Sequence, residues 1–159
     1  MKKRILLIIV VFALLLSGCT LSPADKALVK EAGMTKSVLL NKYSLSKDVI
    51  LSIKNVPLSL PLPDFLTIIY KNNSDSQSYF YGEGCFLEKK LNNTWYMFPA
   101  PTVYLIAHLL KPQASGEVDC YISQYQEYMT VGQYRIVCTV KSDIDSNINE
   151  IVICEFSIE

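Results

Sequence analysis

Apolar and polar residues alternate with a period of two from residue 48 to the C-terminus, which is the pattern of half-buried β-strands. The alternation gives each of four segments one apolar face, and we expect these faces to meet in a core. The four apolar faces are Val49, Leu51 and Ile53; Val118, Cys120 and Ile122; Tyr134, Ile136, Cys138 and Val140; and Val152, Cys154, Phe156 and Ile158.

Turn signals separate these segments from other apolar, strand-like ones. The additional segments are 65–70, 79–90, 94–98 and 102–110. Asn92-Asn93 predicts a hairpin, because asparagine tolerates a positive φ. Prolines exclude a central strand from residues 56–63, which are expected to form an edge segment or a loop. About seven short strands without a long helical pattern predict an all-β sandwich.

Residues 1–18 have the order of a secretory signal peptide: a basic start, an apolar run and small residues before a cleavage point. The alternative interpretation of this segment is a transmembrane anchor. Its apolar run, residues 5–16, is shorter than the roughly 20 residues that a membrane-spanning helix needs. Leu16-Ser17-Gly18-Cys19 is similar to a bacterial lipobox. This resemblance implies cleavage before Cys19, lipidation of its sulfur and attachment of the new N-terminus to the extracytoplasmic face of a cell membrane.

Residues 19–46 lack a long periodic apolar face, so they are interpreted as a tether. Ser22 is a candidate helix cap, with Pro23 at the first helical position, and a short helix would then end near Gly33. The expected organisation is a signal peptide over 1–18, a tether over 19–46 and a sandwich over 47–159.

The chain carries 15 basic and 15 acidic residues, and loss of residues 1–18 removes three basic and no acidic side chains. The remaining, mildly acidic domain has no electrostatic footprint for nucleic acid. The expected partners are the membrane, through the lipid on Cys19, and an unidentified envelope protein or glycan. No cofactor motif is recognised, and no cofactor is expected.

Beyond the lipobox cysteine, four cysteines remain, an even number in an exported domain. A hairpin centred on Ser146 would place Cys138 opposite Cys154, within disulfide reach. We therefore predict a Cys138–Cys154 contact, either as a disulfide or as two packed thiols. Cys85 with Cys120 is the weaker complement.

Three parts of the chain carry a family resemblance. They are Leu87-Glu88-Lys89 followed by Trp95, then Lys111-Pro112, and finally Gly132-Gln133-Tyr134-Arg135. In this order they resemble an immunoglobulin-like domain found in bacterial lipoproteins and other exported proteins. The resemblance implies an immunoglobulin-like β-sandwich of about seven strands over roughly residues 46–159. Gln113 stands where that family has the glycine of a Lys-Pro-Gly turn.

Tyr134 follows Gly132 at the start of a late strand, which fits the tyrosine corner of Greek-key sandwiches. In such a corner the ring lies on the core and the hydroxyl bonds to the backbone. An ordinary strand tyrosine is the alternative.

No pattern in the sequence indicates catalysis or a metal site. His108 is the only histidine, and no Gly-x-Ser-x-Gly motif accompanies it. The acidic segment 143–149 resembles the start of a calcium loop, but Ile148 and Cys154 occupy the positions where an EF-hand needs glycine and an acid. A solvated hairpin loop is the favoured interpretation.

Aromatic residues are dense in two regions, and strand alternation requires about half of them to point into the core. The denser group is Tyr79, Phe80, Tyr81, Trp95, Tyr96, Phe98 and Tyr104, and the second is Tyr121, Tyr125 and Tyr128. Core and edge packing is the favoured interpretation, and a binding surface is the alternative.

These observations predict a lipid-anchored, extracytoplasmic immunoglobulin-like domain that acts as an interaction or structural module and is not an enzyme. The alternative is a ligand-binding lipoprotein that presents an aromatic patch to a glycan or peptide. A hydrolase is disfavoured, because no nucleophile–base pair is visible.

Overall fold

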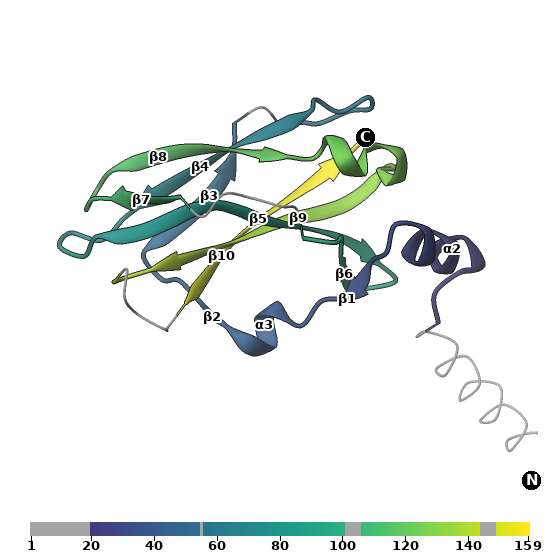
Figure 1. Ribbon diagram of the computed structural model, residues 1–159, viewed down its shortest axis with the longest axis horizontal. Coiled ribbons are helices and arrows are strands. Elements are labelled where there is room, and N and C mark those ends of the chain that lie inside the picture. The colour runs from purple at the N-terminus through teal and green to yellow at the C-terminus, as the bar shows by residue number, and fades with distance from the viewer. Residues whose placement is uncertain (1–19, 55, 101–105, 144–148) are drawn as a thin grey trace, which may run out of the picture.

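A computed structural model describes residues 20–54, 56–100, 106–143 and 149–159 as a two-sheet β-sandwich (Figure 1). The helices are α2 (Pro23–Glu31), α3 (Leu39–Lys42) and a 3₁₀ helix over Ser123–Tyr128. The strands are β1 (Thr35–Lys36), β2 (Ser44–Leu45), β3 (Val49–Ile53), β4 (Phe65–Asn72), β5 (Tyr79–Leu91), β6 (Thr94–Met97), β7 (Ala107–Leu110), β8 (Ser115–Tyr121), β9 (Gly132–Lys141) and β10 (Glu150–Ile158).

Seven strands form a large sheet in the order β1-β6-β5-β9-β10-β2, with β7 paired to the far half of β5. The small sheet has the order β3-β4-β8. All pairs are antiparallel except β2 with β10, which are parallel. The prediction of an all-β, immunoglobulin-like sandwich is therefore confirmed.

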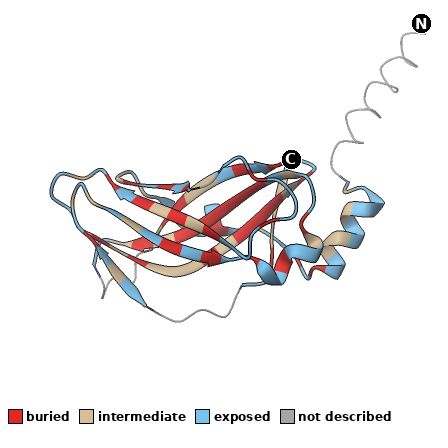
Figure 2. Ribbon diagram, turned by 90° about the horizontal axis from the view of Figure 1, so that it is seen from above, coloured by how far each residue is buried: buried red, intermediate tan, exposed pale blue. Residues whose placement is uncertain are grey.

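The core lies between the inner faces of the two sheets, and buried and exposed positions alternate along the strands (Figure 2). The predicted inner face of β9 is confirmed, because Tyr134, Ile136, Cys138 and Val140 are fully buried. Val137, on the opposite face of β9, is also fully buried and packs with Leu39 and Ile151. The large sheet is thus covered on part of its outer face as well.

The cover on that outer face comes from residues 34–46, which were interpreted as part of a tether. This interpretation is wrong for these residues, because β1 pairs with β6, β2 pairs with β10, and Met34 and Leu39 are buried. Such two-residue strands are too short to show a periodic pattern in the sequence.

The short helix expected after Ser22 is present as α2. The Ser22 side chain accepts a hydrogen bond from the Asp25 amide (3.1 Å), and its hydroxyl donates to the Asp25 carboxylate (2.7 Å). The first bond is an N-cap, and the second holds the Asp25 carboxylate against the capping hydroxyl. The helix ends at Glu31 with Ala32 as its C-cap, next to Gly33, which has φ +62°.

Two turns follow from residues that tolerate a positive φ. Asn92 (φ 45°) and Asn93 (φ 60°) form the predicted hairpin between β5 and β6. Gln113 adopts φ 59° in the turn closed by the Ala114 amide on the Lys111 carbonyl. The Gln113 side chain donates to the carbonyls of residues 73 and 74, so a non-glycine residue is held in a left-handed conformation.

Candidate functional site

The outer face of the small sheet is open to solvent and carries both charged and aromatic side chains. In β8, Glu117, Asp119 and Tyr121 are exposed, and they alternate with the buried Val118 and Cys120. Strand alternation causes this division, because every second residue must point into the core. The exposed positions therefore form a continuous outer row.

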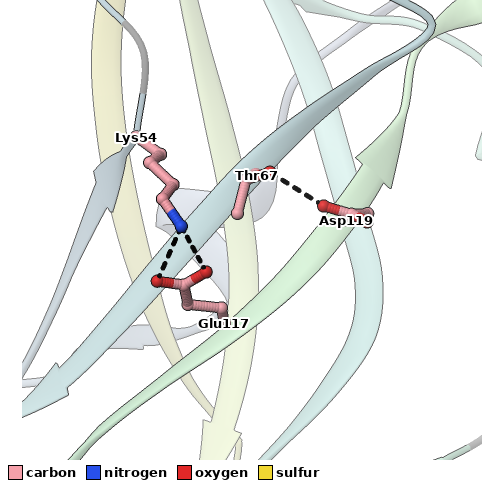
Figure 3. A network of polar contacts seen from close by, with 4 residues as sticks. All are labelled: Lys54, Thr67, Glu117 and Asp119. Atoms are coloured by element: carbon pink, nitrogen blue, oxygen red, sulfur yellow. Dashed lines mark hydrogen bonds and ion pairs between the residues drawn. The ribbon is translucent and has the colours of Figure 1, made fainter.

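Two polar contacts cross this face (Figure 3). Lys54 Nζ lies 3.0 and 3.3 Å from the two carboxylate oxygens of Glu117, and the Thr67 hydroxyl donates to Asp119 at 2.9 Å. The Thr67 bond follows from the register, which pairs Thr67 with Asp119 across β4 and β8. Each contact orients a carboxylate on the surface, although an ion pair this exposed adds at most about 1 kcal/mol to stability.

An exposed aromatic pair stands at one end of the same face. The register places Phe65 opposite Tyr121, and their ring centroids are 6.0 Å apart with an angle of 57° between the rings. Phe65 is 43% exposed and Tyr121 is 63% exposed. Two adjoining exposed rings form a continuous apolar surface, a feature shared with ligand and partner sites. The sequence singled out Tyr121 but missed Phe65, because their pairing depends on a register that local patterns do not specify.

The denser aromatic group serves mainly the core, as favoured from the sequence. Tyr79, Tyr81 and Phe98 are buried, and the ring centroid of Tyr81 lies 4.4 Å from that of Tyr70 on the small sheet. Phe80, Trp95 and Tyr96 are half-buried. Tyr104 lies outside the described residues. These side chains do not form one exposed platform.

His108 does not assemble a catalytic pair in the described part of the chain. Its Nε2 has no hydrogen-bond partner there, and a carboxylate oxygen of Glu83 lies 3.6 Å away. His108 instead packs its ring 5.2 Å from the Tyr81 ring. Nor do three His, Cys, Asp or Glu side chains gather as a metal site among the residues described. Most of the acidic segment 143–149 lies outside those residues.

The predicted Cys138–Cys154 contact is wrong. The register of β9 and β10 places Val152 opposite Cys138 and Ile136 opposite Cys154, so the hairpin is centred on residue 145 and not on Ser146. A shift of one residue in the centre moves each cross-strand partner by two positions. The cross-strand partner of Cys138 on its other side is Cys85 of β5, and their sulfur atoms are 2.9 Å apart.

A charged pair is buried beneath the N-terminal segment on the outer face of the large sheet. Glu88 and Arg135 are cross-strand partners on β5 and β9, and Arg135 Nε donates to Glu88 Oε2 at 2.5 Å. The Ser37 hydroxyl donates to the other Glu88 oxygen. The Arg135 guanidinium lies 4.3 Å from the centroid of the Trp95 ring. These hydrogen bonds and the ring contact offset part of the cost of removing both charges from water.

Lys89 and Tyr134 form a second network at one end of the core. The Tyr134 hydroxyl donates to the Thr130 carbonyl (2.7 Å) and accepts from the Thr130 amide (3.0 Å). Lys89 Nζ donates to Tyr134 Oη and to the Thr130 carbonyl and hydroxyl. Burial lowers the pKa of Lys89 to about 8. The hydroxyl-to-backbone bonds, four residues upstream of Tyr134, confirm the predicted tyrosine corner.

A family model described as a bacterial Ig-like domain matches residues 45–150. The chain belongs to this family. Ig-like domains of this kind are generally non-catalytic and suggest an extracellular interaction or structural module. The search of curated proteins finds no match.

Two solved structures of a β-glucosidase from Kluyveromyces marxianus, one in complex with glucose and one labelled with selenomethionine, are similar to 74% of this Ig-like chain, which spans 14% of theirs. Both are 15% identical to it, with TM-scores of 0.30 and 0.28. A likeness this distant has no bearing on activity.

The residues that carry the family resemblance have structural roles in this Ig-like domain. Glu88, Trp95 and Arg135 build the buried charged network, and Lys89 and Tyr134 build the tyrosine corner. None of these residues contributes to the exposed face of the small sheet. We therefore assign the candidate functional site to that exposed face and the motif residues to the framework.

Proposed function

We propose that this Ig-like domain is a lipid-anchored, extracytoplasmic interaction or structural module at the bacterial cell envelope. The observation that carries the proposal is Leu16-Ser17-Gly18-Cys19, a lipobox-like sequence at the end of an apolar leader. Cys19 lies outside the described residues. Within them, no helix is long and apolar enough to cross a membrane.

The structure supports a short distance between the lipid and the domain. Thr20 is held by the fold, because Asn92 Nδ2 donates to its carbonyl at 3.2 Å. Ser22 caps α2 two residues later. A lipid on Cys19 would therefore hold the β5–β6 hairpin close to the bilayer, without a long flexible linker.

Cys19→Ala is expected to release the protein from the membrane fraction or to leave an uncleaved precursor, because the acylated sulfur is absent. Membrane fractionation and the intact mass of the extracted protein measure both outcomes. Cys154→Ala is the matched control and should leave the fractionation unchanged, since Cys154 lies within β10. Wild-type protein with no acyl mass on Cys19 would refute the anchoring.

A second function, recognition of an envelope glycan, is favoured by the exposed Phe65–Tyr121 pair. Aromatic rings offer apolar faces to sugar rings, and the adjacent Asp119 carboxylate offers hydrogen-bond acceptors. A glycan-binding domain would use this outer face while the sandwich supports it.

Purified peptidoglycan sacculi provide the probe for this second function. Tyr121→Ala is expected to reduce co-sedimentation of the protein with sacculi at least several-fold, because it removes half of the aromatic pair. Val131→Ala is the control, since Val131 is also 63% exposed but lies outside the pair. Equal co-sedimentation of both variants and the wild type would exclude glycan binding by this face.

A further inference from the structure

Three buried cysteines converge in the core from both sheets. Cys85 of β5 and Cys138 of β9 come from the large sheet, and Cys120 of β8 comes from the small sheet. The Cys138 thiol donates a hydrogen bond to Cys85 Sγ at 2.9 Å, and interaction with Cys85 across the core raises the pKa of Cys120. Cys85 is therefore the central member of the group.

Cys85 and Cys138 have the geometry of a cross-strand pair. They are direct partners in the antiparallel register, and their sulfur atoms are 2.9 Å apart. Non-bonded heavy atoms prefer separations of about 3.5–4.0 Å, so the two sulfurs are in unusually close contact. Cα atoms of direct antiparallel partners are about 4.5–5.5 Å apart, which is within the range that a disulfide spans.

We propose that Cys85 and Cys138 are a disulfide-forming pair within the large sheet, with Cys120 as the alternative partner that can exchange onto Cys85. The proposal rests on the proposed export, because an oxidising compartment maintains disulfides. Cys154 is expected to remain a thiol, because its cross-strand partner on β9 is Ile136.

The oxidant is a dithiol–disulfide carrier in the extracytoplasmic compartment to which the protein is exported. The Cys85 thiolate attacks a sulfur of the oxidant disulfide, forms a mixed disulfide and releases one oxidant thiolate. The Cys138 thiolate then attacks the Cys85 sulfur and releases the second oxidant thiolate. The protein loses two electrons and two protons, and the oxidant disulfide is reduced to a dithiol.

The timing of this reaction follows from burial. Cys85 is 3% exposed, Cys120 is 4% exposed and Cys138 is fully buried, so an oxidant cannot reach them in the closed sandwich. The hydrogen bond to Cys85 and burial raise the pKa of Cys120, which keeps this thiol protonated. The bond must therefore form during folding, when β5 and β9 have paired but the small sheet has not yet covered them.

Cys120 provides a second possible bond of a different kind. A Cys85–Cys120 disulfide would link the two sheets, whereas Cys85–Cys138 links neighbouring strands of one sheet. Before the sandwich closes and buries Cys120, attack of its thiolate on Cys85 would convert one bond into the other, with release of the Cys138 thiolate and no net oxidation. The direct register favours the bond within the sheet as the resting form.

Peptide mapping of the mature, membrane-extracted protein tests the proposal. The protein is extracted and unfolded in denaturant with excess N-ethylmaleimide present throughout, so that buried thiols are blocked as they become exposed, and the non-reduced protein is digested with trypsin. Each of the four cysteines lies on a different tryptic peptide: residues 72–89, 91–135, 136–141 and 142–159. The expected result is a peptide 72–89 linked to 136–141, with Cys120 and Cys154 blocked. A dominant link from Cys120 or Cys154, or four blocked cysteines, would overturn the proposal for the exported protein.

A second experiment, refolding in vitro, tests the cysteine pairing independently of the proposed export. The extracted protein is reduced, unfolded and refolded in detergent with reduced and oxidised glutathione. The Cys85–Cys138 link should form here whether or not Cys19 carries a lipid, and its absence would overturn the pairing itself. Formation only in this experiment, with residues 1–18 still attached to the wild-type protein and no acyl mass on Cys19, would refute the export and retain the pair.

Two variants complete the test. Cys138→Ser should abolish the expected link and transfer Cys85 to Cys120 on refolding. Cys154→Ser is the matched control and should leave the Cys85–Cys138 link unchanged. Loss of the link in Cys154→Ser would overturn the assignment.

Discussion

Arg135→Met is expected to lower the free energy of unfolding by about 3–5 kcal/mol, because it leaves the Glu88 carboxylate buried without its cation. Glu88 is fully inaccessible to solvent, and its carboxylate is bound by Arg135 Nε and the Ser37 hydroxyl. The methionine side chain preserves most of the volume beside Trp95. Denaturant unfolding of the wild type and the variant measures the difference.

Two further variants separate the buried charge from general damage to the sheet. The double variant Glu88→Met with Arg135→Met should be more stable than Arg135→Met alone, since it removes the unpaired charge along with its partner. Lys54→Met breaks the exposed pair with Glu117 and should cost at most about 1 kcal/mol. A loss in Arg135→Met as small as that in Lys54→Met would contradict the role assigned to the buried pair.

The strand faces could be predicted from the sequence because burial imposes a period of two. Tyr134, Ile136, Cys138 and Val140 alternate with Arg135 and Val137 on the other face, and the first four line the core. The burial of Arg135 could not be predicted in the same way. It depends on residues 34–46, which cover the large sheet with two-residue strands and a single helical turn.

The register between paired strands is the second feature that could not be predicted from the sequence. The β9–β10 hairpin was located correctly, but its centre was placed one residue late, which produced the wrong Cys138–Cys154 pairing. The Cys85–Cys138 and Phe65–Tyr121 pairs join residues that are more than 50 positions apart in the sequence. Such pairs depend on long-range register, and local alternation carries no information about it.

Ile136→Ala is expected to cost about 2–5 kcal/mol of unfolding free energy, because it opens a cavity at the centre of the core. Ile136 is fully buried on β9, between Leu87 of β5 and Cys154 of β10. Neighbouring strands on both sides restrict the relaxation that could fill the space. Ile50→Ala is the matched control, since Ile50 is also in a strand but is 52% exposed. Denaturant unfolding should separate the two variants, and equal shifts would show that Ile136 is not part of a tightly packed core.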